Sequence, residues 1–169
     1  MEEGLESALL WHRLMGKKVL AVNQTGSPFL RVYAHCSKGM TGVTLLLINL
    51  SNTTEFDVTV RNEMNLNLQW GEDVQEGGSF LTNLKKTFAW IGRKASDTTD
   101  QRKEYHLTPK DGNLRSQIML LNGIPLELNA DESIPDLDPV MVDVNSPIVV
   151  APLSIAFASF PKFEVAACV

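Results

Sequence analysis

Reactive side chains are scarce in this sequence of 169 residues. It holds two cysteines and three histidines, and aromatic residues make up only 7% of it. The histidines, His12, His35 and His106, lack the H-x-x-x-H spacing of a zinc site on a helix. The serines lack the G-x-S-x-G turn that presents a hydrolytic nucleophile. The sequence therefore predicts neither zinc-dependent nor serine-dependent hydrolysis, and we expect no metal and no cofactor.

Long apolar runs and an excess of positive charge are also missing. The longest candidate for an apolar span, residues 43–50, is far shorter than the roughly 18 residues that cross a membrane, so no transmembrane segment is expected. Fifteen basic residues against 20 acidic ones give a net charge of −5. Because phosphate binding needs a concentrated basic surface, this balance argues against nucleic acid as a partner.

The two cysteines, Cys36 and Cys168, lie far apart, and the second is the next-to-last residue. A free thiol so near the end would be exposed and reactive, so we predict a disulfide. Closing so long a loop would remove about 5 kcal/mol of chain entropy from the unfolded state. Three N-x-S/T acceptor sequences, at Asn23, Asn49 and Asn52, indicate the same oxidising, secretory compartment. The alternative is a cytosolic protein with two inert thiols.

The period of the apolar residues predicts one helix followed by strands. Residues 5–15 combine strong helix formers with Gly16 as the stop signal, and apolar side chains cover more than half of the circumference. A short helix this apolar should lie between two layers. After Gly16, about eight short β-rich runs are typical of an antiparallel β-sandwich. The expected strands lie within residues 19–22, 30–34, 43–50, 56–61, 105–107, 116–121, 126–128, 140–144 and 148–160.

Between residues 70 and 103 the strand pattern is lost, and we expect a long loop with one short element at residues 84–91. Six basic side chains give this part a local positive balance within an acidic protein: Lys85, Lys86, Arg93, Lys94, Arg102 and Lys103. One interpretation is a contact for an anionic polysaccharide. The favoured interpretation is a solvated loop without a ligand.

Carboxylates gather in two clusters, at residues 72–76 and at Asp131-Glu132, and both lie in expected loops. Glycoside hydrolysis needs two carboxylates that face each other on rigid elements, so we interpret both clusters as solvated turns and predict no catalytic residue. His35 and Cys36 form no catalytic pair either, because adjacent residues of a strand point to opposite faces.

Several strings of the sequence, taken in order, resemble the heparanase and plant β-glucuronidase family of glycoside hydrolases (family 79). The strings are SALLWHRLMGKKVL (7–20), LRVYAHC (30–36), GVTLLLINL (42–50), EYHLTPKDGNLRSQ (104–117), LLNG (120–123) and the final AACV. The resemblance implies that residues 1–16 are the last helix of a (β/α)8 barrel and that residues 17–169 form the β-sandwich beside it. Trp11, Leu14 and Met15 would then be buried between barrel and sandwich.

In that family the barrel carries a retaining mechanism with two glutamates, so the resemblance places both of them upstream of Met1. It implies a non-catalytic portion whose partner is the missing barrel of the same enzyme, and whose parent cleaves glucuronides or glucuronic-acid-containing polysaccharides. The family's C-terminal cysteine bridge corresponds to Cys36 and Cys168. The alternative is a stand-alone extracellular carbohydrate-binding or adhesion module without enzymatic activity.

The first residues, Met1-Glu2-Glu3, are acidic where a secretory signal peptide would be basic and then apolar. Together with the marks of secretion, this start predicts a piece of a longer protein. We expect the parent's signal peptide to direct it outside the cell or to the cell wall, to a vacuolar or lysosomal compartment, or to the periphery of a membrane.

Overall fold

The computed structural model describes residues 5–23, 26–61, 100–129 and 133–168. These ranges contain one α-helix, ten strands and two short 3-10 helices. The elements are α1 (Leu5–Leu14), β1 (Met15–Leu20), β2 (Leu30–Ser37), β3 (Val43–Asn49), β4 (Phe56–Val58), β5 (Gln101–Pro109), η2 (Lys110–Gly112), β6 (Met119–Leu121), β7 (Ile124–Pro125), β8 (Val140–Asp143), β9 (Ile148–Val150), β10 (Ile155–Phe160) and η3 (Ala166–Cys168). The predicted mainly β chain with one N-terminal helix is confirmed.

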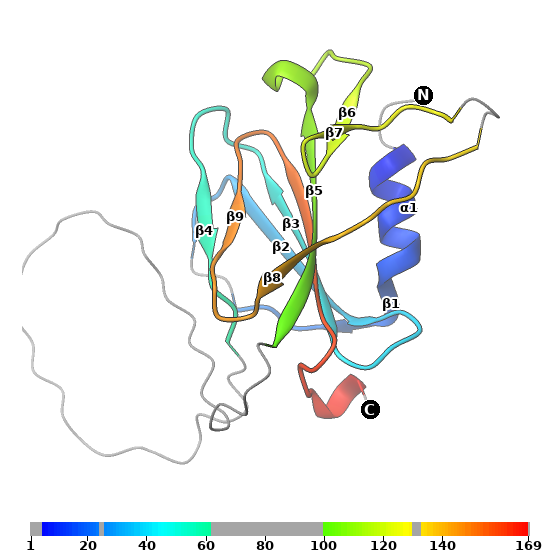
Figure 1. Cartoon of the computed structure of the whole chain (residues 1–169). Coiled ribbons are helices and arrows are strands. Elements are labelled where there is room, and N and C mark those ends of the chain that lie inside the picture. Colours follow the sequence, from blue (N-terminus) through cyan, green and yellow to red (C-terminus); the bar gives the residue numbers. More distant parts are fainter. Residues whose placement is uncertain (1–4, 24–25, 62–99, 130–132, 169) are drawn as a thin grey trace, which may run out of the picture.

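Eight of the strands form one antiparallel sheet in the order β1-β2-β3-β10-β5-β6-β7, with β8 paired to β5. Strand β8 pairs with the first half of β5 and β6 with its second half, so the long β5 supports both. The two remaining strands, β4 and β9, pair with each other as a small second sheet. Figure 1 shows α1 on one side of the large sheet and the β4–β9 pair on the other.

The large sheet is covered on both faces because alternate residues of its central strands point to opposite sides. Leu45 and Leu47 of β3 pack with residues of β9 in one core. Leu46 of the same strand packs with Leu10 of α1 and Phe157 of β10 in a second core on the helix side. The near-continuous apolar sequence of β3 therefore reflects a strand that is buried on both faces.

The helix ends one residue earlier than the sequence predicts, and Gly16 has a different role. Met15 already belongs to β1 and pairs with Ser37 of β2. A Cβ atom on Gly16 would lie 2.4 Å from the carbonyl oxygen of Cys36. Glycine is thus required here by the close approach of two strands, and its expected use as a helix stop is wrong.

Three other expectations, on the start of β5, on the β6–β7 turn and on residues 126–128, are settled by the structure. Residues 101–103, expected in a loop, belong to β5. The tight turn at Asn122-Gly123 is confirmed, with φ of 51° and 82°, as the primed hairpin turn requires. The partner of β6 is Ile124–Pro125, whereas residues 126–128, expected as a strand, form none. The element expected at residues 84–91 lies outside the described residues. Within the described ranges, no helix reaches the length and hydrophobicity of a membrane span.

Candidate functional site

The strongest group of ionisable side chains in the described residues lies on β5. Arg102, Glu104 and His106 occupy alternate positions of this strand, which places them on the same face of the sheet. One carboxylate oxygen of Glu104 lies 2.6 Å from Nε of Arg102, and the other lies 2.7 Å from Nε2 of His106. We call these three residues the β5 cluster. Both oxygens of its single carboxylate are therefore engaged inside the protein.

Arg102 is a structural cation. Its side chain is 1% exposed, and its Nη1 and Nη2 atoms donate to the carbonyl oxygens of Asp143, Ser146 and Pro147 at 2.7–3.0 Å. The guanidinium also lies 5.6 Å from the ring centre of Phe160, within range of a cation–π contact. These contacts attach the β8–β9 turn to β5. The expected contact of Arg102 with a polysaccharide is wrong, because the protein itself buries and binds this side chain.

Of the other members of the predicted basic group, the structure describes Lys103 alone. Lys103 follows Arg102 on β5 and is half-buried. Because neighbouring residues of a strand point to opposite faces, Lys103 does not share the environment of Arg102. Lys85, Lys86, Arg93 and Lys94 lie outside the described residues. Among the described residues, Arg102 and Lys103 therefore do not form a common basic surface.

Two opposing effects act on the pKa of Glu104. Burial raises it, but hydrogen bonds from His106 and Arg102, together with their positive charge, lower it by more. The net result is a pKa below the ordinary value of 4.5. The carboxylate therefore stays ionised at neutral pH and offers no proton for general acid catalysis.

The chemistry available to the β5 cluster is limited by its single carboxylate. A retaining glycosidase needs a second carboxyl group about 5–5.5 Å away, and none is among the partners of Glu104. No group of three or more possible metal ligands occurs in the part of the chain that the structure describes. The two acidic clusters at residues 72–76 and at Asp131-Glu132 lie outside that part. The β5 cluster is thus an internal ion network.

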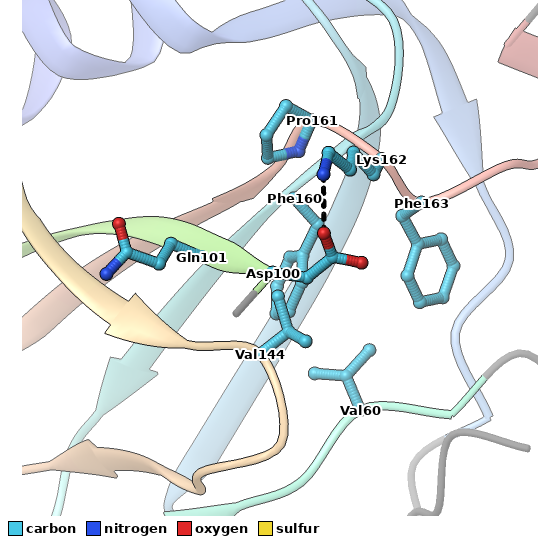
Figure 2. Close-up of a pocket in the computed structure, with 8 residues that line it drawn as sticks. All are labelled: Val60, Asp100, Gln101, Val144, Phe160, Pro161, Lys162 and Phe163. Carbon is cyan, nitrogen blue, oxygen red and sulfur yellow. Dashed lines mark hydrogen bonds and ion pairs between the residues drawn. The ribbon is translucent and has the colours of Figure 1, made fainter. Parts of the chain in front are cut away.

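A small cavity lies where β4, β5, β8 and β10 end close together (Figure 2). Its volume is about 30 Å³, which holds one or two waters but no sugar ring. Asp100 and Lys162 meet at its edge in an ion pair of 2.5 Å, drawn as a dashed line in Figure 2. The residues that line the cavity are Val60, Asp100, Gln101, Val144, Phe160, Pro161, Lys162 and Phe163. As bounded by the described residues, the cavity therefore has room for water and not for a sugar ring.

The two cysteines are joined in the structure. Cys36 of β2 and Cys168 of η3 form a disulfide, with their Cα atoms 5.3 Å apart. Lys18 of β1 adds a hydrogen bond from Nζ to the carbonyl oxygen of Ala167, at 2.9 Å. His35 instead contacts the Gly16 carbonyl oxygen through Nδ1, at 2.7 Å. The disulfide fixes η3 to β2 and leaves no thiol for a pair with His35.

The three expected glycan acceptors differ in environment. Asn23 and Asn52 are exposed. Asn49 is 1% exposed, and its amide nitrogen lies 2.7–3.0 Å from the carbonyl oxygens of Thr54, Val150 and Ala151. An attached sugar would need space that the buried Asn49 lacks, and it would replace one of the two N–H groups that face these carbonyl oxygens. The environment of Asn49 therefore argues against the expected glycan at this position in the folded chain.

Comparison with known proteins places this chain among plant glycosidase-related sequences, although no family model matches it. It is 56% identical over 162 residues to Heparanase-like protein 1 and 52% identical to Heparanase-like protein 2, both of Arabidopsis thaliana. It is 34% identical over 155 residues to Baicalin-beta-D-glucuronidase of Scutellaria baicalensis. The matches cover 92–96% of this chain but only 23–30% of these three proteins. The chain is therefore a relative of the C-terminal part of plant heparanase-like proteins, as its sequence strings predicted.

We predict that Glu104→Gln destabilises the fold by about 3–5 kcal/mol, because the change leaves the buried Arg102 without its counter-charge. Urea unfolding at pH 7 measures the effect. The control is Glu55→Gln, which removes an exposed carboxylate and should change stability by less than about 0.5 kcal/mol. Equal unfolding midpoints for the two variants would contradict the structural role of the cluster.

The loss of stability caused by Glu104→Gln should depend on pH. Since the folded-state pKa of Glu104 is lowered, its contribution is complete above the unfolded value near 4.5 and is lost as the pH falls through the folded value. The difference in unfolding free energy between the native chain and Glu104→Gln should therefore shrink below about pH 4.5. A difference that grows on acidification would show that the sign is wrong.

We expect the Cys36–Cys168 disulfide in the purified protein. Peptide mapping under non-reducing conditions should recover the two cysteine peptides as one linked species. Replacing both cysteines by serine should cost about 2–5 kcal/mol in a thermal or urea melt. Recovery of two alkylatable thiols from the native protein would refute the linkage.

Proposed function

We propose that this chain is the non-catalytic C-terminal β-sandwich portion of a secreted glycoside hydrolase, and that it supports a catalytic domain located upstream. The parent would hydrolyse O-glycosyl bonds of glucuronides or of glucuronic-acid-containing polysaccharides by a retaining mechanism with two glutamates. One observation carries the proposal: the chain matches less than a third of the length of its glycosidase-type relatives.

The single carboxylate of the β5 cluster agrees with a supporting role. Both oxygens of Glu104 are taken by internal partners, and the cavity near Lys162 has a volume of only about 30 Å³. Neither place offers a sugar ring the two facing carboxylates of a retaining site. On this proposal, the substrate is bound and cleaved by the upstream part.

Exposed apolar side chains on the helix side of the sheet support the proposal that another domain covers this side. Trp11 of α1 is 40% exposed and touches His35 edge-on, with ring centres 5.0 Å apart. Val19 pairs with His35 and is 69% exposed, so it belongs to the same side of the sheet. Tyr33, opposite Leu46 of the helix-side core, is 46% exposed. We call Trp11, Val19 and Tyr33 the Trp11 face.

The sequence predicts Trp11, Leu14 and Met15 at the contact with the barrel, and their exposures in this chain differ. Met15 is buried and Leu14 half-buried within this chain, whereas Trp11 leaves much of its indole ring in water. Neighbouring exposed apolar side chains of this size are typical of a surface that another domain covers. We therefore propose that the upstream catalytic domain covers the Trp11 face. Leu10, fully buried against the sheet, would anchor α1 whether or not that domain is present.

We predict that the purified chain does not hydrolyse an aryl β-glucuronide, because the residues that would form its acid–base pair are upstream. The measurement compares release of the aryl group by this chain and by a complete heparanase-like parent at equal molarity. Turnover by this chain that disappears on substitution of one of its own carboxylates would overturn the proposal. The stand-alone module would be favoured if this chain bound an acidic polysaccharide and the complete parent showed no turnover.

We also predict that the cost of Trp11→Ala depends on the upstream domain. In this chain the loss should be about 1–2 kcal/mol, since the ring is only partly buried, whereas in the complete parent it should reach about 3–5 kcal/mol. Leu114→Ala is the control, because Leu114 is 60% exposed and lies outside the Trp11 face. Its effect should be small in both proteins. An equal cost of Trp11→Ala in both settings would exclude the Trp11 face as the domain contact.

A further inference from the structure

We propose that Asn52 carries an N-linked glycan, and that Asn49, three residues earlier, stays unmodified because its amide is a structural element of the fold. The inference rests on the secretory localisation proposed above. The two acceptor sequences, Asn49-Leu50-Ser51 and Asn52-Thr53-Thr54, directly follow each other, so sequence alone ranks them equally. The structure separates them by burial and by hydrogen bonding.

Asn49 uses its whole side-chain amide within the protein. Besides the three carbonyl oxygens near its nitrogen, its Oδ1 accepts a hydrogen bond from the backbone N–H of Ser51 at 2.9 Å. These contacts join the end of β3 to Val150 of β9 and to the residue that follows it. Glycosylation would replace one of the two N–H groups and would push a sugar into a position that is 1% exposed.

The hydroxyl group of the first acceptor sequence is also occupied. Ser51 is 7% exposed, and its Oγ accepts hydrogen bonds from the backbone N–H groups of Thr53 and Thr54 at 3.3 and 2.9 Å. In the second acceptor sequence, Asn52, Thr53 and Thr54 are all exposed on the β3–β4 turn. The same small turn therefore presents one acceptor to solvent and closes the other.

The surroundings of Asn52 fit a glycan. Phe29 and Leu50 are 54% and 51% exposed, and the backbone N–H of Leu50 donates to the carbonyl oxygen of Phe29 at 2.8 Å. A glycan on Asn52, two residues after Leu50, would shield these apolar side chains from water. Figure 1 shows the β3–β4 turn far from α1 and η3, so this glycan would leave the Trp11 face free for the upstream domain.

Transfer of the glycan to Asn52 forms one bond and breaks one bond. The Nδ2 atom of Asn52 forms a bond to C1 of an oligosaccharide that is carried on a polyprenyl diphosphate. The bond from C1 to the diphosphate oxygen breaks, the diphosphate leaves with the electron pair, and Nδ2 gives up one proton. Because the transfer takes place on the unfolded chain, both asparagines are reachable at that stage. Only a chain that is left unmodified at Asn49 can then make the contacts of Asn49 and fold, whereas a glycan on the exposed Asn52 does not interfere with them.

The test is secretion of the full chain behind an added signal peptide, followed by removal of glycans with an amidase in H2(18)O. This treatment converts each occupied asparagine to labelled aspartate, and mass spectrometry reads each position. We expect label at Asn52 and none at Asn49. Thr54→Val should remove the Asn52 label and Thr54→Ser should retain it, since only backbone atoms of Thr54 contribute to the contacts described above.

Two results would overturn the proposal: label at Asn49 in the folded, secreted chain, or no label at Asn52 in that chain. Because the added signal supplies entry to the secretory pathway, either result speaks against the site itself. The proposed localisation is tested separately, by following the complete parent with its own leader. An Asn49→Ala chain, which lacks the amide contacts, should be secreted several-fold less than an Asn52→Gln chain. Equal yields of the two chains would contradict the structural role of Asn49.

Discussion

The central position of β10 is the constraint on which the rest of the structure depends. This strand pairs with β3 on one side and with β5 on the other, so it joins two strands that are distant in the sequence from it and from each other. Phe157 points to the helix side, whereas Ala156 and Ala158 point to the β4–β9 side. Small residues on one side and a large one on the other let two different layers pack against the same strand. Without β10 neither core would be closed.

Polar groups inside this sheet are placed where they join strands. The hydroxyl groups of Ser37, Thr44 and Ser159 form a line across β2, β3 and β10, with 2.9 Å between successive oxygens. Arg102 joins β5 to the β8–β9 turn, and Asn49 joins β3 to β9. Because an unpaired buried polar group costs about 1–3 kcal/mol, each of these contacts also selects one arrangement of the strands over its alternatives.

Much of the fold could be predicted from the period of the apolar residues and from the turn residues, and the candidate site could not. The hairpin at Asn122-Gly123 follows from local backbone chemistry, and the strand positions follow from β-branched runs. Arg102 was expected in an exposed loop, because a group of positively charged residues in a sequence usually contacts solvent. The useful signal was the alternation of Arg102, Glu104 and His106, which places opposite charges on one face of a strand. Likewise Gly16 and Asn49 are explained by contacts with distant segments, which a local pattern does not contain.

The position of β10 in the chain has a consequence for biosynthesis. A ribosome delivers β3 and β5 before the strand that pairs with both of them. During that interval the inner edges of β3 and β5 expose unpaired backbone groups and the apolar side chains of two cores. Pairs such as Leu46 with Phe157 also span more than a hundred residues, which slows the search for the native sheet. The nascent chain thus keeps two sheet edges open to association with other chains until β10 has emerged.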